Sequence, residues 1–312
     1  MPGYRAGRRA VVQKEQGADN PRPRRTMIHL PHQFDRRTAP PLRIGAVQYL
    51  NTKPLVHGLG GAGDLAYDLP SRLADGLSAG RLDVALIPSV EALRGGYRIV
   101  SDACIGCRGP VMSVKVFFRT APGRVATLAV DEGSRTSAAL ARVLLAERHG
   151  LRPQVELLPI GSGLRDTQAD AVLLIGDRAI EAHGVDRMSG SFQVVWDLGD
   201  EWCRWTGLPF VFAVWAVRDG VEPGMLVDRL TAARDAGVAN LAAIAAAEAA
   251  AHGLTVPQCL SYLRDNLHYV LGDREREALE LFGRRAAALG LVPRNVRPRL
   301  SPPARRVEEV GR

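Results

Sequence analysis

The sequence predicts a two-lobed α/β protein with a helical C-terminal part. Asp83–Ile87 and Ala171–Ile175 are runs without polar alternation, which is typical of strands buried on both faces of a sheet. Strand and helix signals alternate around each run, which favours an α/β lobe at each place. No strand signal follows Pro223, so we expect the chain to end in helices.

The first lobe begins with an expected strand at 42–48. Pro54–Leu59 fits a short helix, because proline suits the first helical turn. After a short strand at 66–69, Ser71 is expected to cap a helix that Gly80 ends.

Four further strands are expected besides the apolar run at 171–175. They are Val111–Phe118, Val125–Val130, Val194–Leu198 and Phe210–Val217. Ser134–His149 has the apolar spacing of a helix, with Gly150 as its stop. Of three helices expected after Pro223, Thr255 opens the middle one and Gly272 divides the last two.

The formal net charge of +8 is concentrated in the two tails. Residues 1–40 hold nine Arg and Lys against three Asp and Glu, and residues 293–312 hold six Arg against two Glu. The segment 41–292 therefore carries a net charge of −2. A nearly neutral body does not favour nucleic acid as a partner, because such proteins usually carry a basic face on the folded part.

Composition also predicts where the protein works. No run approaches the roughly 18 apolar residues that a membrane span needs, and the N-terminal segment has no apolar core typical of a secretion signal. The four cysteines do not form a disulfide framework. We therefore expect a cytoplasmic protein with no membrane partner.

Two α/β lobes followed by helices are typical of the type II periplasmic-binding-protein-like fold. Such folds bind ligands in the cleft between lobes, at the carboxyl ends of strands. The predicted division is a disordered basic extension (1–41), lobe 1 (42–123 with 217–300), lobe 2 (124–216) and a disordered tail (301–312).

Polar residues follow several of the predicted strands. Each has a plain structural explanation: Asn51 fits a turn, Asp177 fits a helix cap, and Ser113 is a small polar residue that a strand tolerates. The turn Ser134–Ser137 fits a helix cap, but its hydroxyls and free N–H groups also suit a carboxylate.

Five ordered motifs give this sequence a family resemblance. They are YLNTKPL (49–55), GPVMS (109–113), SRTS (134–137), LIGD (174–177) and WTGLPFVFAVW (205–215). In this order they resemble chorismate dehydratase of the futalosine route to menaquinone. The resemblance covers roughly residues 42–300 and leaves both tails outside.

The resemblance implies a hydro-lyase that acts on chorismate without a cofactor or metal, as a monomer or a homodimer. It implies that Asn51 and Ser113 are the functional asparagine and serine. It also implies a carboxylate-binding element formed by Ser134, Arg135, Thr136 and Ser137. We add Gly176, Asp177 and Thr206 to the substrate-binding residues, because they lie in the motifs at predicted strand ends or beside the cleft.

Other function classes fit the sequence less well. The related 1,4-dihydroxy-6-naphthoate synthase shares the fold but differs in its first loop, which is rich in Ser, Pro and Asp, and it uses a histidine as base. The loop YLNTKP at 49–54 resembles the dehydratase instead. A solute-binding protein would need a secretion signal, and a transcription regulator would need an N-terminal helix-turn-helix. Cys104 and Cys107 lack the second pair of ligands that a structural zinc site requires. The side chains of His57, Arg108 and Lys53 could either face solvent or take part in the site.

Overall fold

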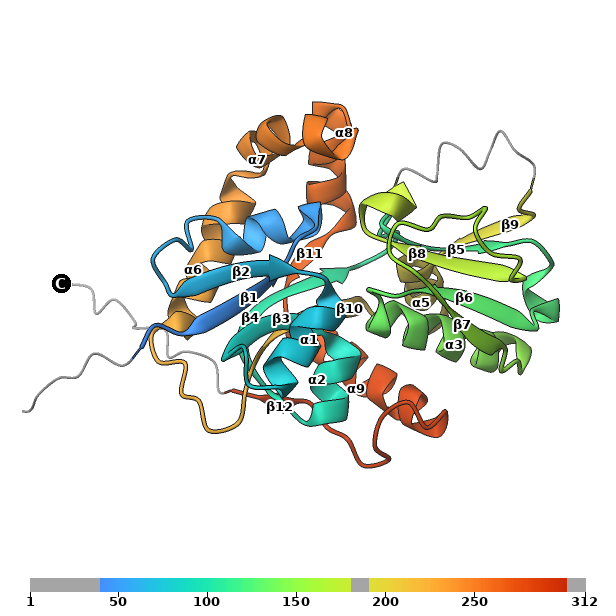
Figure 1. Ribbon diagram of the computed structural model, residues 1–312, viewed down its shortest axis with the longest axis horizontal. Coiled ribbons are helices and arrows are strands. Elements are labelled where there is room, and N and C mark those ends of the chain that lie inside the picture. The colour runs from blue at the N-terminus through green and yellow to red at the C-terminus, as the bar shows by residue number, and fades with distance from the viewer. Residues whose placement is uncertain (1–39, 181–190, 302–312) are drawn as a thin grey trace, which may run out of the picture. The chain divides into compact units, whose positions relative to one another are not determined.

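The computed structural model describes residues 40–180 and 191–301, which form two β-sheets with helices packed on them (Figure 1). The predicted two-lobed α/β class is confirmed, since each sheet mixes parallel and antiparallel pairs and contacts its own helices. The extension expected at 1–41 and the tail expected at 301–312 lie almost wholly outside the described residues.

The first sheet has seven strands, in the order β11-β4-β10-β3-β1-β2 with β12 beside β4. The strands are β1 (Arg43–Val47), β2 (Asp64–Asp68), β3 (Val84–Pro88), β4 (Arg98–Cys107), β10 (Phe210–Val217), β11 (His268–Val270) and β12 (Arg299–Leu300). β1 runs parallel to β2 and β3, whereas β10 is antiparallel to β3 and β4. Every residue of β3 is buried, as its apolar run predicts.

The second sheet has five strands, in the order β7-β6-β8-β5-β9. They are β5 (Val114–Phe118), β6 (Thr127–Asp131), β7 (Gln154–Leu158), β8 (Ala171–Ile175) and β9 (Val194–Asp197). β6 runs parallel to β7 and β8, and β5 is antiparallel to β8 and β9. β8 is buried throughout, as expected for its apolar run.

Strand pairing divides the chain differently from the expected boundaries at 123 and 216. β5 was expected in lobe 1 but pairs with β8 and β9, and β10 was expected in lobe 2 but pairs with β3 and β4. Both strands are buried along their whole length. Because an apolar strand fits the middle of either sheet, only its partners decide where it lies.

Helices complete the fold on both sheets. They are α1 (Pro70–Ser78), α2 (Ser89–Gly95), α3 (Arg135–His149), α5 (Leu198–Thr206), α6 (Leu226–Ala239), α7 (Leu241–Glu248), α8 (Val256–Ser261) and α9 (Asp273–Ala288). Short turns are the 3-10 segments η1 (Leu50–Val56), η2 (Pro122–Arg124) and η3 (Ala250–His252) and the π turn η4 (Tyr262–Asn266). None of the helices in the described ranges is long and apolar enough to cross a membrane.

Several helix ends follow the sequence and others do not. Thr255 opens α8 with a full capping box, and Gly150 ends α3 in the left-handed conformation, both as predicted. Ser71 is not the cap of α1: Leu69 is, because Pro70 already has the φ of a first helical residue. The region after Pro223 also contains β11 and β12, whose three and two residues are too few to show a periodic signal.

Candidate active site

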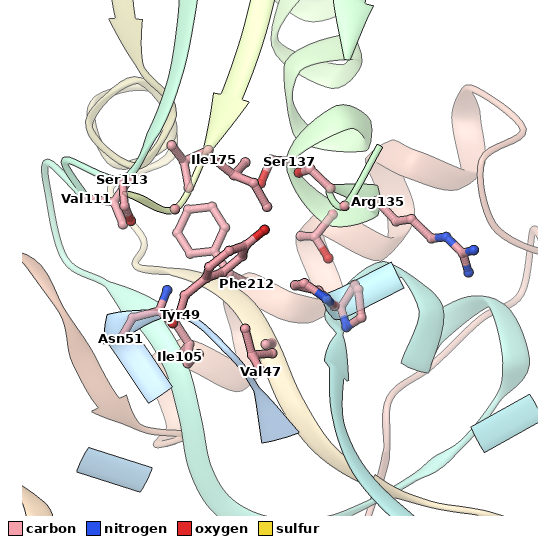
Figure 2. Close-up of a pocket in the computed structure, with 18 residues that line it drawn as sticks. Val47, Tyr49, Asn51, Ile105, Val111, Ser113, Arg135, Ser137, Ile175 and Phe212 are labelled. Atoms are coloured by element: carbon pink, nitrogen blue, oxygen red, sulfur yellow. The ribbon is translucent and has the colours of Figure 1, made fainter. Parts of the chain in front are cut away.

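A pocket lies where strand ends of the two sheets meet (Figure 2). It holds about 520 Å³ of empty space, counting the part open to solvent. Its polar lining residues are Tyr49, Asn51, Ser113, Ser134, Arg135, Thr136 and Ser137, and its apolar walls include Val47, Ile105, Val111, Ile175 and Phe212. Gly176 also lines the pocket, so seven of the nine predicted site residues line it; the other two are Asp177 and Thr206.

Asn51 reaches the pocket from the first turn of η1. The sequence predicted a loop here with a helix from Pro54, but the 3-10 turn already begins at Leu50. Tyr49 is the extended residue before it, so the chain turns directly out of β1. The Asn51 Oδ1 accepts a bond of 3.3 Å from the Thr52 hydroxyl, which leaves the amide nitrogen for other partners.

Ser113 is held in place by backbone contacts just before β5, rather than inside the strand as expected. The Asp197 carboxylate accepts bonds from the backbone N–H groups of Val111 (2.9 Å) and Met112 (2.7 Å). The Ser113 carbonyl accepts a 2.8 Å bond from the Gly176 N–H. The Ser113 side chain is thus placed by contacts that belong to both β8 and β9.

Met112 has a φ of 66°, the only positive φ outside glycine among the described residues. A methionine in the left-handed region is uncommon and is strained by its Cβ. The Asp197 bonds compensate for this conformation, which turns the chain from the first sheet into the second. Asp197 also caps α5 through Gly199 and Asp200. Asp197 was not among the predicted residues, although an aspartate before a helix is a recognisable capping signal.

Ser134 and Ser137 present hydroxyls at the start of α3. Ser134 is the N-cap, yet its side chain makes no capping bond, and its buried Oγ has no partner among the described residues. The first N–H groups of a helix lack partners within it, and the helix dipole favours a negative charge there. This end of α3 is therefore suited to a carboxylate.

Asp131 holds the turn that leads into α3. Its carboxylate accepts bonds from the N–H of Gly133 (3.0 Å) and of Ile175 (3.3 Å), and it pairs with Arg178. Burial raises the pKa of Asp131, and Arg178 acts in the opposite direction. The carboxylate thereby ties the ends of β6 and β8 together beneath the pocket.

Arg135 and Thr136 are engaged elsewhere, although both line the pocket. The Arg135 guanidinium makes two bonds of 2.8 and 2.9 Å to Asp75 of α1, and Figure 2 shows it pointing away from the pocket. The Thr136 Oγ1 accepts a 3.2 Å bond from the N–H of Val90 in α2. These two side chains contact helices of the first sheet, whereas no hydrogen bond to a protein group occupies the Ser134 hydroxyl among the described residues.

The Tyr49 side chain packs against the turns at Gly133 and Gly176. A Cβ placed on Gly176 would lie 3.1 Å from the Tyr49 ring, and one on Gly133 would lie 3.4 Å from its hydroxyl. Gly176 also has a φ of 61°, so glycine is required there for both reasons. Burial, with the nearby Asp131 charge, raises the pKa of Tyr49 well above its ordinary value. Its phenol is therefore a neutral donor.

Asp177 and Thr206 do not line the pocket. The Asp177 carboxylate lies 2.9 Å from the Nδ1 of His252. The Thr206 hydroxyl donates to the Trp202 carbonyl at 2.9 Å and accepts from the Leu208 N–H at 3.1 Å, so it closes the end of α5. The structure therefore gives Thr206 a local capping contact rather than the predicted substrate contact.

The remaining candidates have structural partners. All four cysteines are free, and no group of three or more His, Cys, Asp or Glu suited to a metal occurs in the part of the chain that the structure describes. Arg108 bonds to the buried Glu275 at 3.0 Å, and Lys53 pairs with Glu248 at 3.0 Å. His57 is not among the residues that line the pocket.

Comparison with known proteins shows the family to which this chain belongs. A family model described as menaquinone biosynthesis matches residues 42–288. The chain is 34% identical over 267 residues to chorismate dehydratase of Thermus thermophilus, covering 80% of this chain and 96% of that protein. It is 30% identical over 165 residues to chorismate dehydratase of Campylobacter jejuni, covering 53% and 58%.

Solved structures share the fold at much lower identity. Protein AF1704 of Archaeoglobus fulgidus matches with a TM-score of 0.62 and 17% identity, covering 80% of this chain and 98% of that one. The alkanesulfonate-binding protein SsuA of Xanthomonas axonopodis also matches with a TM-score of 0.62, at 15% identity, covering 85% and 99%. The latter is a binding protein of the fold that the sequence predicted.

Proposed function

Because this chain belongs to the menaquinone biosynthesis family, we propose that it removes water from chorismate to give 3-[(1-carboxyvinyl)oxy]benzoate. The observation that supports this proposal is the pocket, which is lined by Asn51 and Ser113 and by Ser134, whose buried Oγ has no partner among the described residues. The substrate is thus a small dicarboxylate. The reaction as written consumes no cofactor, and we propose that it takes place in the cytoplasm.

The reaction requires one proton and one hydroxide to leave neighbouring ring carbons. When the C3–H bond breaks, its electron pair is delocalised through the ring double bond towards the ring carboxylate. The same electrons then form the new ring double bond as the C4–O bond breaks and the hydroxyl leaves. The proton and the hydroxide make up the water lost, and the ring becomes aromatic.

We assign the ring carboxylate to the start of α3. Negative charge grows on this carboxylate as the C3 proton leaves, so donors already in place stabilise the transition state more than the substrate. The hydroxyls of Ser134 and Ser137 and the free N–H groups of the helix are such donors. The apolar walls formed by Ile105, Ile175 and Phe212 strengthen these interactions by excluding water.

Asn51 and Ser113 are assigned to the leaving hydroxyl and the developing anion. Neither is a base at neutral pH, so each acts as a hydrogen-bonding group. Among the described residues that line the pocket there is no His, Asp, Glu or Lys. This supports proton transfer to the substrate's own enolpyruvyl carboxylate, which can lie over C3–H. The same lining does not favour a reaction that needs a histidine base, as in the related naphthoate synthase.

Incubation of the purified protein with chorismate tests the proposal. We expect the substrate mass to fall by one water, with the absorbance of an aromatic product. Asn51→Ala and Ser113→Ala should each lower kcat about 100- to 1000-fold, because each removes a preorganised donor. The double variant should lose less than the product of the two effects if both groups serve one transition state.

Thr206→Ala is the matched control, since its hydroxyl bonds to α5 and not to the pocket. It should keep the kcat of the natural protein. Unchanged turnover in Asn51→Ala or Ser113→Ala, with Thr206→Ala also active, would remove that residue from the mechanism. No loss of water from chorismate would refute the proposed function itself.

A further inference from the structure

A row of four polar side chains runs from the turn after β8 to η1. The Asp177 carboxylate lies 2.9 Å from the Nδ1 of His252. The Nε2 of the same ring lies 3.6 Å from one carboxylate oxygen of Glu248, and the other oxygen lies 3.0 Å from the Lys53 ammonium. We call Asp177, His252, Glu248 and Lys53 the clasp.

Both ends of the clasp adjoin walls of the pocket. Asp177 directly follows Gly176, which lines the pocket after β8 of the second sheet. Lys53 lies in η1, two residues after Asn51, which lines the pocket after β1 of the first sheet. Between them, α7 carries Glu248 and packs against η1 (Figure 1). The clasp therefore connects the two walls between which a ligand would lie.

The clasp holds more negative than positive charge unless His252 carries a proton. Asp177 and Glu248 are two carboxylates against the single Lys53 ammonium. A neutral imidazole has one donor and one acceptor nitrogen, so one carboxylate faces a ring lone pair, whereas an imidazolium donates from both nitrogens. The His252 side chain is 13% exposed, so salt and water screen these contacts weakly. Protonation therefore strengthens the clasp on both sides of the ring.

The titratable groups around the clasp do not supply the balancing charge. Arg178, which follows the clasp aspartate in the chain, pairs with Asp131 instead. Burial raises the pKa of Tyr49, Tyr262 and Cys259, and a clasp carboxylate adds to each of these shifts. The two phenols and the thiol therefore stay neutral near pH 7, which leaves the imidazole as the group that can respond.

We propose that His252 is a positioning residue whose protonation holds the two walls of the pocket together. Histidine is the side chain whose charge ordinarily changes between about pH 5 and pH 8. In the described chain the clasp residues lie outside the pocket lining, so they act through the walls and not on the substrate itself. The clasp should therefore affect substrate capture more than the chemical step. The kinetic test of this inference rests on the proposed function.

The pH profile of KM for chorismate tests the inference. We expect KM of the natural protein to rise about two- to fivefold from pH 6 to pH 8 at nearly constant kcat, since partly exposed ion pairs contribute modestly. His252→Gln cannot take up the proton, so its KM at pH 6 should already equal or exceed the natural value at pH 8 and should stay flat. His149→Gln is the matched control, because this ring stacks on Trp196 at the end of α3 away from the pocket. It should keep the natural profile.

Asp177→Asn is a second variant that tests the clasp even if His252→Gln folds poorly. It removes one of the two carboxylates, so it should also raise KM at pH 6 and flatten the profile. The double variant should be no worse than either single one, because both act on the same contact. A rise of KM with pH that persists in His252→Gln, or a fall in kcat alone in either variant, would overturn the inference.

Amide hydrogen exchange tests the clasp without any substrate. At pH 6 the backbone amides of η1 and of residues 176–180 should exchange about two- to fivefold faster in His252→Gln than in the natural protein, because looser walls open more often. His149→Gln should exchange like the natural protein. Equal exchange in His252→Gln and the natural protein would rule out the clasp. If the natural protein does not dehydrate chorismate, the proposed function fails, whereas faster exchange in the variant would still support the clasp.

Discussion

The start of α3 contains residues of similar chemistry with different tasks. Ser134 and Ser137 line the pocket, and the buried Ser134 Oγ has no partner in the described part of the chain. Thr136 uses its Oγ1 for the Val90 N–H, and it lies 3.5 Å from the Ser89 hydroxyl. The hydroxyls therefore divide into two that can bind a ligand and one that bonds to α2.

We predict that Ser137→Ala raises the KM for chorismate about tenfold or more. A hydrogen bond to a charged group contributes roughly 1.5–3 kcal/mol, and each 1.4 kcal/mol corresponds to about tenfold in affinity. Steady-state kinetics of Ser134→Ala, Ser137→Ala and the double variant measure this directly. Unchanged constants in the double variant would move the carboxylate to another part of the pocket.

Lys115 is an unusual residue for its element. It lies in β5, a strand that is otherwise apolar, and its side chain is buried. Burial lowers the pKa of Lys115 from 10.5 to about 8, and the Asp197 charge acts in the opposite direction. In the pairing of β5 with β9, Lys115 stands opposite Asp197, whose carboxylate holds the turn before Ser113. The strand thus includes a charged group that costs stability.

The pKa shift of Lys115 sets a pH dependence with a definite sign. Between pH 8 and pH 10.5 the unfolded chain holds more protons on this lysine than the folded chain does, so stability rises with pH across that window. Below pH 8 the full cost of the buried charge is present. We predict that Lys115→Met raises the free energy of unfolding at pH 7 by about 1–3 kcal/mol.

Denaturant unfolding of Lys115→Met and the natural protein at pH 7, 8, 9 and 10 measures this effect. The difference between the two should shrink as pH rises towards 10.5. Lys53→Met is the control, because Lys53 is partly exposed and paired with Glu248. A constant difference at all pH values would show that packing, and not the charge, sets the effect.

At the scale of the whole molecule, a few polar contacts join the parts built on the two sheets. Arg135 of α3 bonds to Asp75 of α1, and Thr136 bonds to the N–H of Val90 in α2. On another side His252, which follows α7, bonds to Asp177 after β8. Arg135 and Thr136 also line the pocket, so their contacts join its two sides.

We predict that Arg135→Ala raises the KM for chorismate about two- to fivefold with little change in kcat. Partly exposed ion pairs contribute at most about 1 kcal/mol, which is near fivefold. Asp75→Ala is the matched partner variant and should give the same increase, and the double variant should be no worse than either single one. A rise in KM with Arg135→Ala but not with Asp75→Ala would instead show that Arg135 binds the substrate.

The sequence alone determined much of the fold class and most of the pocket. Apolar runs without polar alternation predict strands buried on both faces, Thr255 predicts the start of a helix, and Gly150 predicts the end of one. These features can be predicted because each depends only on neighbouring residues. The same is true of Asn51, which follows β1, since the carboxyl ends of parallel strands share one edge of a sheet. Ser113, which precedes β5, was identified by its motif.

Only the tertiary structure decided which sheet each strand joins and what each polar group bonds to. β5 and β10 are both buried along their whole length, so their places depend on partners distant in sequence. Arg135, Thr136 and Thr206 sit in the expected motifs but bond to neighbouring helices or to their own helix. Asp197 reaches the site through contacts between distant segments, which no local pattern records.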